Sequence, residues 1–232
     1  MTVRLMIILA FIAVPCFAAD TDITTPSNAQ IKKWWKPQKE WVPSDKMVVE
    51  KTARVILKGG EVAFLASVAF PRRGSNFLSG TVLIRPALKE AREIEKARRV
   101  LEIHDLDGDG ISEVIAESFG SGTGTTSGEK TILSFDDWKP IVLYVQGYSD
   151  DLGACSKEVV GRPCHAKEVE WAFRDVDGDQ ILDLVEVIKL GEGEENDQLK
   201  WKKRTNVLLF KDKKFVPASP DPTPPNVAPQ LR

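Results

Sequence analysis

Hydrophobic and polar residues alternate along residues 48–216 in short runs that are separated by glycine-containing turns. This pattern is typical of antiparallel strands with one buried face. The runs at 54–57 and 61–70 are joined by a Lys-Gly-Gly turn and predict a hairpin, and a further strand is expected at 80–84. The exception is 87–97, where strong helix formers follow a proline and predict one short helix. We therefore expect a mainly β protein.

The second part of this β domain repeats itself, in units at about 98–146 and 167–216. Each unit shows a strand, an acidic loop, a strand, a long polar loop and a third strand, with a candidate fourth strand at its end. Internal repetition of this kind is the mark of blade-like or stacked β architecture. The sequence therefore predicts antiparallel blade-like repeats, arranged either as a β-propeller-like fold or as a smaller open β assembly.

The acidic loops of the two units carry oxygen-bearing side chains at positions 1, 3, 5 and 9. Alternate side chains of a tight turn face the same side, so these oxygens converge on one point. Calcium takes six to eight hard oxygen ligands and tolerates irregular geometry. One Asp-Gly turn would mean little, because such turns are common in hairpins, but the same spacing occurs twice between similar strands. The predicted ligands are Asp105, Asp107, Asp109, Glu113 and the carbonyl of Ile111, and Asp175, Asp177, Asp179, Asp183 and the carbonyl of Ile181.

Both loops resemble the calcium-binding hairpins of FG-GAP and VCBS-type repeats, which are familiar from the propellers of integrin α-subunits and from exported bacterial proteins. The resemblance covers about half of the 232 residues and implies a β-propeller-like architecture with structural calcium. Two features depart from that pattern. Gln180 replaces the glycine at position 6 of the second loop, and two copies are fewer than the four blades of the smallest propellers. EF-hands are not indicated, because strands rather than helices flank the loops.

Residues 1–19 have the pattern of a secretory signal. Arg4 precedes an apolar run at 5–14, and small residues allow cleavage after Ala18 or Ala19. The apolar run is too short to span a bilayer. We therefore expect a periplasmic or secreted protein with no transmembrane segment after cleavage.

Cys155 and Cys164 remain after cleavage of that signal, in an oxidising compartment. The sequence therefore predicts a disulfide between them. The competing interpretation is a zinc site that adds His104 and His165, but the cysteine spacing fits no common zinc pattern.

Two polar, proline-containing segments flank the β domain. Residues 20–47 hold Trp34, Trp35 and Trp41, and prolines interrupt regular structure there, so we expect an extended arm. Its indole rings either cover the core of the domain, which we favour because exposed tryptophan is costly, or form a platform for a sugar or peptide. Residues 217–232 are rich in proline and predict a disordered tail.

Composition and motifs restrict the function further. A net charge of −2 gives no indication of nucleic-acid binding. The glycine-rich stretch at 122–131 lacks the adjacent Gly-Lys of a phosphate loop, because Glu129 separates the two residues. We expect a non-enzymatic, exported calcium-binding module with a structural or binding role in the cell envelope, whose partner would be an envelope protein or a glycan. The alternative is an envelope hydrolase or carbohydrate-active protein with a cleft between the loops at 120–128 and 191–197.

Overall fold

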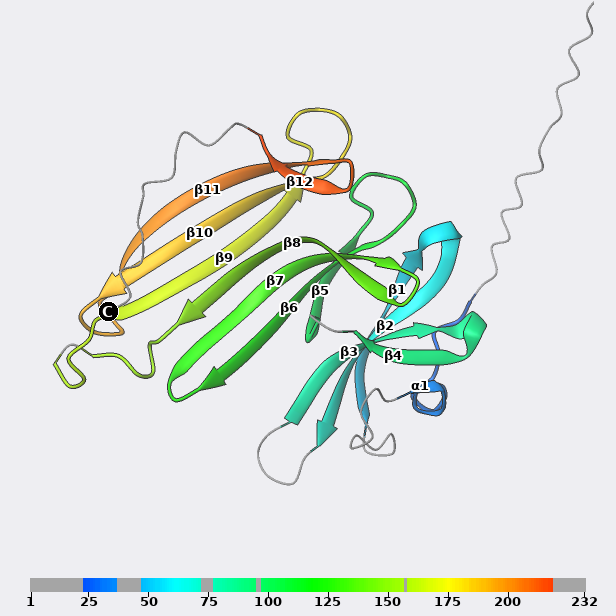
Figure 1. Cartoon of the computed structure of the whole chain (residues 1–232), viewed down its shortest axis with the longest axis horizontal. Helices are drawn as coiled ribbons and strands as arrows, with labels where there is room; N and C mark the ends of the chain where they lie inside the picture. The colour runs from blue at the N-terminus through cyan, green and yellow to red at the C-terminus, as the bar shows by residue number, and fades with distance from the viewer. Residues whose placement is uncertain (1–22, 37–46, 72–76, 95–96, 157, 219–232) are drawn as a thin grey trace, which may run out of the picture.

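The computed structural model describes residues 23–36, 47–71, 77–94, 97–156 and 158–218, which form two antiparallel sheets and one α-helix (Figure 1). The predicted signal, Trp41 and nearly all of the proline-rich tail lie outside these residues. No helix among the described residues is long and apolar enough to cross a membrane.

The smaller sheet has the strand order β1-β2-β3-β4, and the larger has the order β12-β11-β10-β9-β8-β7-β6-β5. Neighbouring strands are consecutive in the sequence, so both sheets are antiparallel meanders. The helix is α1 (Asn28–Trp34), and the strands are β1 (Val48–Leu57), β2 (Glu61–Pro71), β3 (Phe77–Arg85), β4 (Glu90–Ile94), β5 (Arg99–His104), β6 (Glu113–Gly122), β7 (Thr125–Asp136), β8 (Lys139–Asp150), β9 (Cys164–Arg174), β10 (Asp183–Gly193), β11 (Lys200–Lys211) and β12 (Lys214–Pro217).

The predicted helix at 87–97 is wrong. Only residues 86–88 form a short 3-10 turn, and β4 follows it and pairs with β3. Lys89 takes a left-handed conformation with φ of 52° and redirects the chain into that strand. Intrinsic helix propensity is a weak preference, and here the burial of Ala91 and Ile94 against the sheet outweighs it.

The observed helix lies in the segment that we expected to be an extended arm. Ser27 caps α1 in a reciprocal capping box with Gln30, and the helix ends before Pro37. Trp35 follows the helix, is 6% exposed and bridges to Ala91 of β4. Trp35 therefore covers the core of the smaller sheet, as the favoured interpretation predicted, and is not available as an exposed platform.

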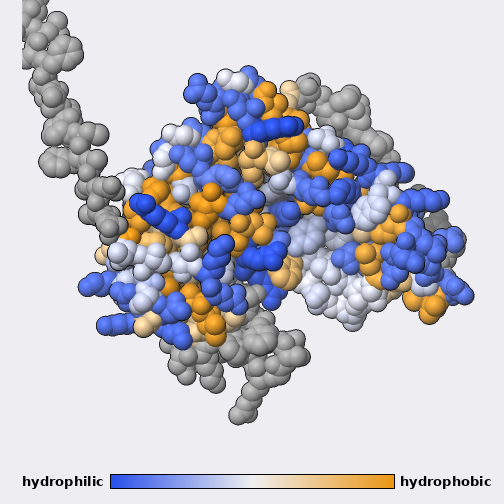
Figure 2. Space-filling model, turned by 180° about the vertical axis from the view of Figure 1, so that it is seen from behind, coloured by the Kyte–Doolittle hydropathy of each residue, from blue (hydrophilic) through white to orange (hydrophobic). Residues whose placement is uncertain are grey.

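Three hydrophobic clusters hold the layers together. The first lies between α1 and one face of the smaller sheet, and the second lies between the other face of that sheet and β6 and β7. The third lines the opposite face of the larger sheet and reaches from Ile115 to Leu208. On the side of the molecule seen in Figure 2, hydrophobic residues form separate patches bordered by hydrophilic ones.

The two units predicted as repeats lie in one sheet. Strands β5–β8 form the first unit and β9–β12 the second, and only Ser149 and Asp150 of β8 pair with β9. The chain therefore has the smaller open assembly of the two predicted architectures. Beyond that short pairing, Glu186 ties the units together, because its buried carboxylate accepts hydrogen bonds from Tyr144, Gln146, Trp171 and Asn206.

Candidate metal centre

The two acidic loops lie at the same end of the larger sheet, one between β5 and β6 and the other between β9 and β10 (Figure 1). They contact each other directly, because the Leu182 amide donates to the carbonyl of Leu106 at 2.7 Å. The first loop is also attached to the smaller sheet, since Ser112 exchanges hydrogen bonds with the backbone of Ile56. The first loop is therefore held on two sides, which fixes the arrangement of its carboxylates.

Backbone amides orient the carboxylates of the first loop. Gly110 donates to Asp105 at 2.9 Å, Ile111 donates to Asp109 at 2.8 Å, and Leu106 donates to Glu113 at 2.9 Å. Each of these bonds uses one carboxylate oxygen and leaves the second oxygen free to face another group. Asp105, Asp107 and Glu113 bring one oxygen each to within 4.8 Å of the others. The structure therefore gathers these three predicted ligands in one cluster.

Glu113 is the distinctive member of this cluster. Its side chain is fully buried, and its Oε1 atom accepts no hydrogen bond. An ionised carboxylate is costly to bury unless a cation or donors compensate it. Burial raises the pKa of Glu113 above its ordinary value, and the hydrogen bond from Leu106 and the charge of Lys213 only partly oppose that rise. Glu113 therefore keeps one buried oxygen for which the described residues supply no hydrogen-bond donor.

A side-chain cation already reaches the cluster. The Nζ atom of Lys213 lies 2.7 Å from carboxylate oxygens of both Asp107 and Asp109, and 3.6 Å from Oε1 of Glu113. Desolvation alone would lower the pKa of Lys213, but its bonds to Asp107 and Asp109 raise it overall. For Asp109, desolvation acts to raise the pKa, and the bonds from Lys213 and Ile111 outweigh it and lower the pKa. The first loop therefore holds the ammonium group of a lysine from another hairpin.

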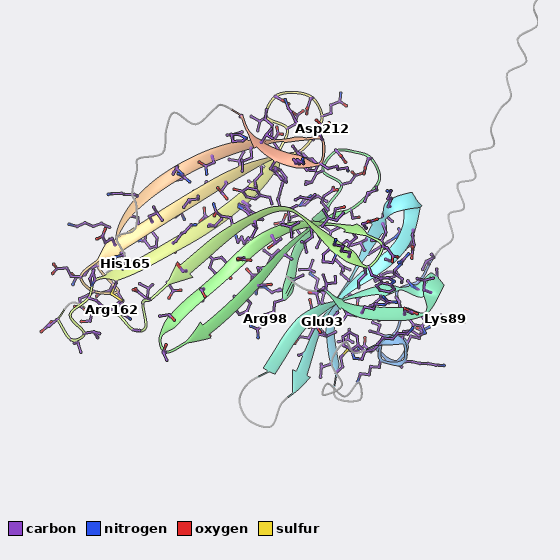
Figure 3. The ribbon with its side chains drawn as sticks, viewed as in Figure 1. Lys89, Glu93, Arg98, Arg162, His165 and Asp212 are labelled. Atoms are coloured by element: carbon purple, nitrogen blue, oxygen red, sulfur yellow. A yellow bond between two sulfur atoms is a disulfide. The ribbon has the colours of Figure 1, made fainter. Side chains whose placement is uncertain are left out.

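Lys213 owes its position to the turn between β11 and β12. Asp212 and Lys213 form the two-residue connection of this hairpin and have φ values of 51° and 59°. Such turns normally use Asn-Gly or Asp-Gly, because both central residues are left-handed. Figure 3 places Asp212 at the end of the sheet that holds the acidic loops, opposite His165 and Arg162.

The second loop gathers three carboxylates as the first does, but more of its carboxylate oxygens accept backbone hydrogen bonds. Asp175, Asp177 and Asp183 again bring oxygens within 4.8 Å of one another. Both oxygens of Asp183 accept backbone bonds, from Val176 and Phe210, and both oxygens of Asp175 accept bonds from Gly178 and Gln180. The nearest lysine contact is weaker, with Lys211 3.4 Å from Asp177. Backbone amides thus satisfy this loop more fully than the first.

Gln180 shows why glycine is usual at position 6. It has a φ of 70°, close to the 82° of Gly110 at the same position of the first loop. A side chain in this left-handed region costs roughly 1–2 kcal/mol. The second loop therefore keeps the repeat geometry at the expense of local strain.

The predicted disulfide is confirmed. Cys155 and Cys164 are bonded, with their Cα atoms 5.0 Å apart, so neither is free to bind zinc. The two histidines of the zinc interpretation contact other residues. His104 forms a hydrogen bond with Glu102 and packs against the ring of Phe173. His165 lies 3.7 Å from Asp151.

The sequence did not reveal the roles of Lys213 and Glu186. The predicted third and fourth strands of the second unit implied a turn between them. No local pattern indicated that this turn reaches a loop about 100 residues earlier. For Glu186, the one signal in the sequence was a glutamate placed in an apolar strand, which is typical of a buried polar role.

Comparisons with known proteins do not assign the chain to a family. No protein-family model matches the sequence, and neither curated proteins nor solved structures gave a match.

Proposed function

We propose that this chain is an exported, calcium-stabilised β module, with the first acidic loop as its principal calcium site. The buried Oε1 of Glu113 carries the proposal, because it accepts no hydrogen bond and belongs to a side chain that clusters with Asp105 and Asp107. Calcium there would be bound by the carboxylates of Asp105, Asp107, Asp109 and Glu113 and the carbonyl of Ile111. It would neutralise their mutual repulsion and tie the loop to β6.

The second loop is a weaker calcium site on this proposal. Its two best-placed carboxylates are already held by backbone amides at both oxygens, and Gln180 strains the turn. Extracellular calcium modules often bind at about 10⁻⁴–10⁻³ M, and the second loop is expected at the weak end of that range.

The contacts made by the acidic side chains of one large cavity favour the binding role over the hydrolase alternative. A cavity of about 430 Å³ contains Glu117, Asp150 and Glu168. Glu117 is ion-paired with Arg99, Glu168 lies 3.7 Å from Lys189, and Asp150 accepts the amide of Leu152. Glycoside hydrolysis uses two carboxyl groups that flank the scissile bond, and each of these three acids is instead held by a neighbouring group.

Thermal unfolding tests the calcium proposal. Calcium at about 20 times the dissociation constant stabilises a folded protein by RT ln 21, about 1.8 kcal/mol, which corresponds to roughly 4–7 °C in a protein of this size. Asp107→Ala should remove most of this rise, Asp177→Ala should remove less of it, and the exposed control Asp136→Ala should retain it. A melting temperature that is the same in calcium and in chelator would show that the loops are ordinary turns.

A further inference from the structure

The outer edge of β11 is only partly covered. β12 pairs with Leu208–Lys211, and the Ala218 amide then donates to the carbonyl of Val207 at 3.0 Å. No other strand in the described part of the chain pairs with this edge between Lys200 and Asn206. A sheet edge of this length presents unpaired backbone groups to any extended chain that approaches it.

The register shows which backbone groups face outward. In an antiparallel strand, successive residues direct their N–H and C=O groups to opposite neighbours. Because the carbonyl of Val207 faces outward, the same holds for Thr205, Lys203 and Trp201. These three residues therefore offer N–H and C=O groups for a further strand.

The side chains of this edge are strongly basic. Lys200, Lys202, Lys203 and Arg204 are all exposed, and none of them forms an ion pair within the described residues. Lys202 is paired across the sheet with Leu190, which is 51% exposed and in turn lies opposite Lys167. A cavity of about 520 Å³ opens here, lined by His165, Lys167, Leu190, Glu192, Lys200 and Lys202. A single acid therefore faces several cations.

The positive charge of this edge determines which kind of chain can pair with it. A second copy of the chain would place lysine and arginine opposite like charges, and such edges are a known protection against self-pairing. An acidic strand reverses the sign of every one of those contacts. Residues two apart on a strand lie about 6.8 Å apart on the same face, so alternating carboxylates match the spacing of Lys202 and Arg204.

We propose that the open edge of β11 binds an extended acidic polypeptide segment of a partner protein as a further antiparallel or parallel strand. Backbone bonds to Trp201, Lys203 and Thr205 hold the segment, and alternate carboxylates face Lys202 and Arg204. The proposal supplies the chemistry of the partner in the binding role above, and it does not require calcium.

Fluorescence anisotropy with a labelled peptide tests this inference on the full chain. The peptide alternates Glu with Thr or Val, and the comparison peptide replaces each Glu with Lys. We expect saturable binding of the acidic peptide only, weakened at least tenfold by Lys202→Glu with Arg204→Glu. The matched control, Lys58→Glu with Lys89→Glu, changes two exposed lysines of the smaller-sheet turns and should bind as the wild type does. Figure 3 shows Lys89 well away from β11.

Thr205→Pro separates strand addition from simple charge attraction. Proline removes the outward N–H of Thr205 but leaves the sheet bonds to β10, and proline is tolerated at sheet edges. Strand addition predicts at least a fivefold loss of affinity, with circular dichroism unchanged. Equal binding by wild type and Thr205→Pro would indicate a polyanion surface, such as one for an acidic glycan, and would overturn the proposal, as would the absence of binding. The calcium-dependent melting shift is independent of this result, so the two proposals fail separately.

Discussion

Replacing Lys213 with methionine is expected to strengthen calcium binding at the first loop. Methionine keeps much of the length and apolar volume of the lysine stem but removes the cation that contacts Asp107 and Asp109. Calcium has to displace the lysine from these carboxylates or bind beside it. In either case calcium binding to the wild-type protein weakens the contacts of Lys213 with Asp107 and Asp109, and this cost is absent in the variant.

The magnitude follows from the exposure of the lysine. Its side chain is 41% exposed, so solvent screens both contacts, and each is worth about 0.2–1 kcal/mol. Two contacts give roughly 0.4–2 kcal/mol, which corresponds to a dissociation constant about 2–30 times lower. In chelator the variant should unfold at a slightly lower temperature, because four carboxylates then repel one another without a counter-ion.

Isothermal titration calorimetry with calcium measures this change. Lys214→Met is the matched control, because Lys214 is the next residue, is exposed and lies in the same hairpin. It should bind calcium as the wild type does. If Lys213→Met and Lys214→Met gave the same dissociation constant as the wild type, the lysine would not compete with the metal and the proposed centre would be misplaced.

Three further variants test other parts of the structure by thermal unfolding. Gln180→Gly should raise the free energy of unfolding by about 1 kcal/mol, since it removes the left-handed strain; no change would mean that the turn is unstrained. Glu186→Gln should lower it by about 1–3 kcal/mol, because one amide cannot accept all four hydrogen bonds; a neutral result would contradict the role of Glu186 in joining the repeat units. Cys155→Ala with Cys164→Ala should lower it by about 2–3 kcal/mol, the value of a short closed loop, and reduction of the wild type should reproduce that loss.

Local patterns were sufficient to predict the strands and the acidic loops. Alternation of buried and exposed residues over a few positions is a local property, so the hairpin of β1 and β2 and the four strands of each predicted unit were predicted correctly. The long loop predicted at 120–128 is wrong, because β6 and β7 pair as far as Gly122 and Thr125 and leave only a tight turn between them. The disulfide was also a local inference, from two cysteines that the predicted secretory signal would place in an oxidising compartment. By contrast, helix propensity at 87–97 was overridden by pairing of β4 with β3.

Long-range contacts were not predictable in the same way. The clustering of both acidic loops at one end depends on the meander order of eight strands, and the contact of Lys213 with the first loop depends on where the last hairpin lies. Neither the alternation of residues nor the spacing of a motif predicts contacts between segments so far apart in the sequence. The two loops also differ in how many carboxylate oxygens accept backbone hydrogen bonds. One of the donors in the second loop is the amide of Phe210, which lies in another strand, so the loop sequence alone could not predict this difference.

The most direct test of the calcium centre is a calcium titration of Glu113→Gln beside Asp183→Asn. Both changes neutralise a fully or nearly fully buried acid at position 9, but only Glu113 has an oxygen without a hydrogen bond. We predict that Glu113→Gln loses the stronger calcium site yet unfolds in chelator at the wild-type temperature or above, because burial disfavours its ionised form. Asp183→Asn should keep that site. Unchanged calcium binding by Glu113→Gln would contradict the account.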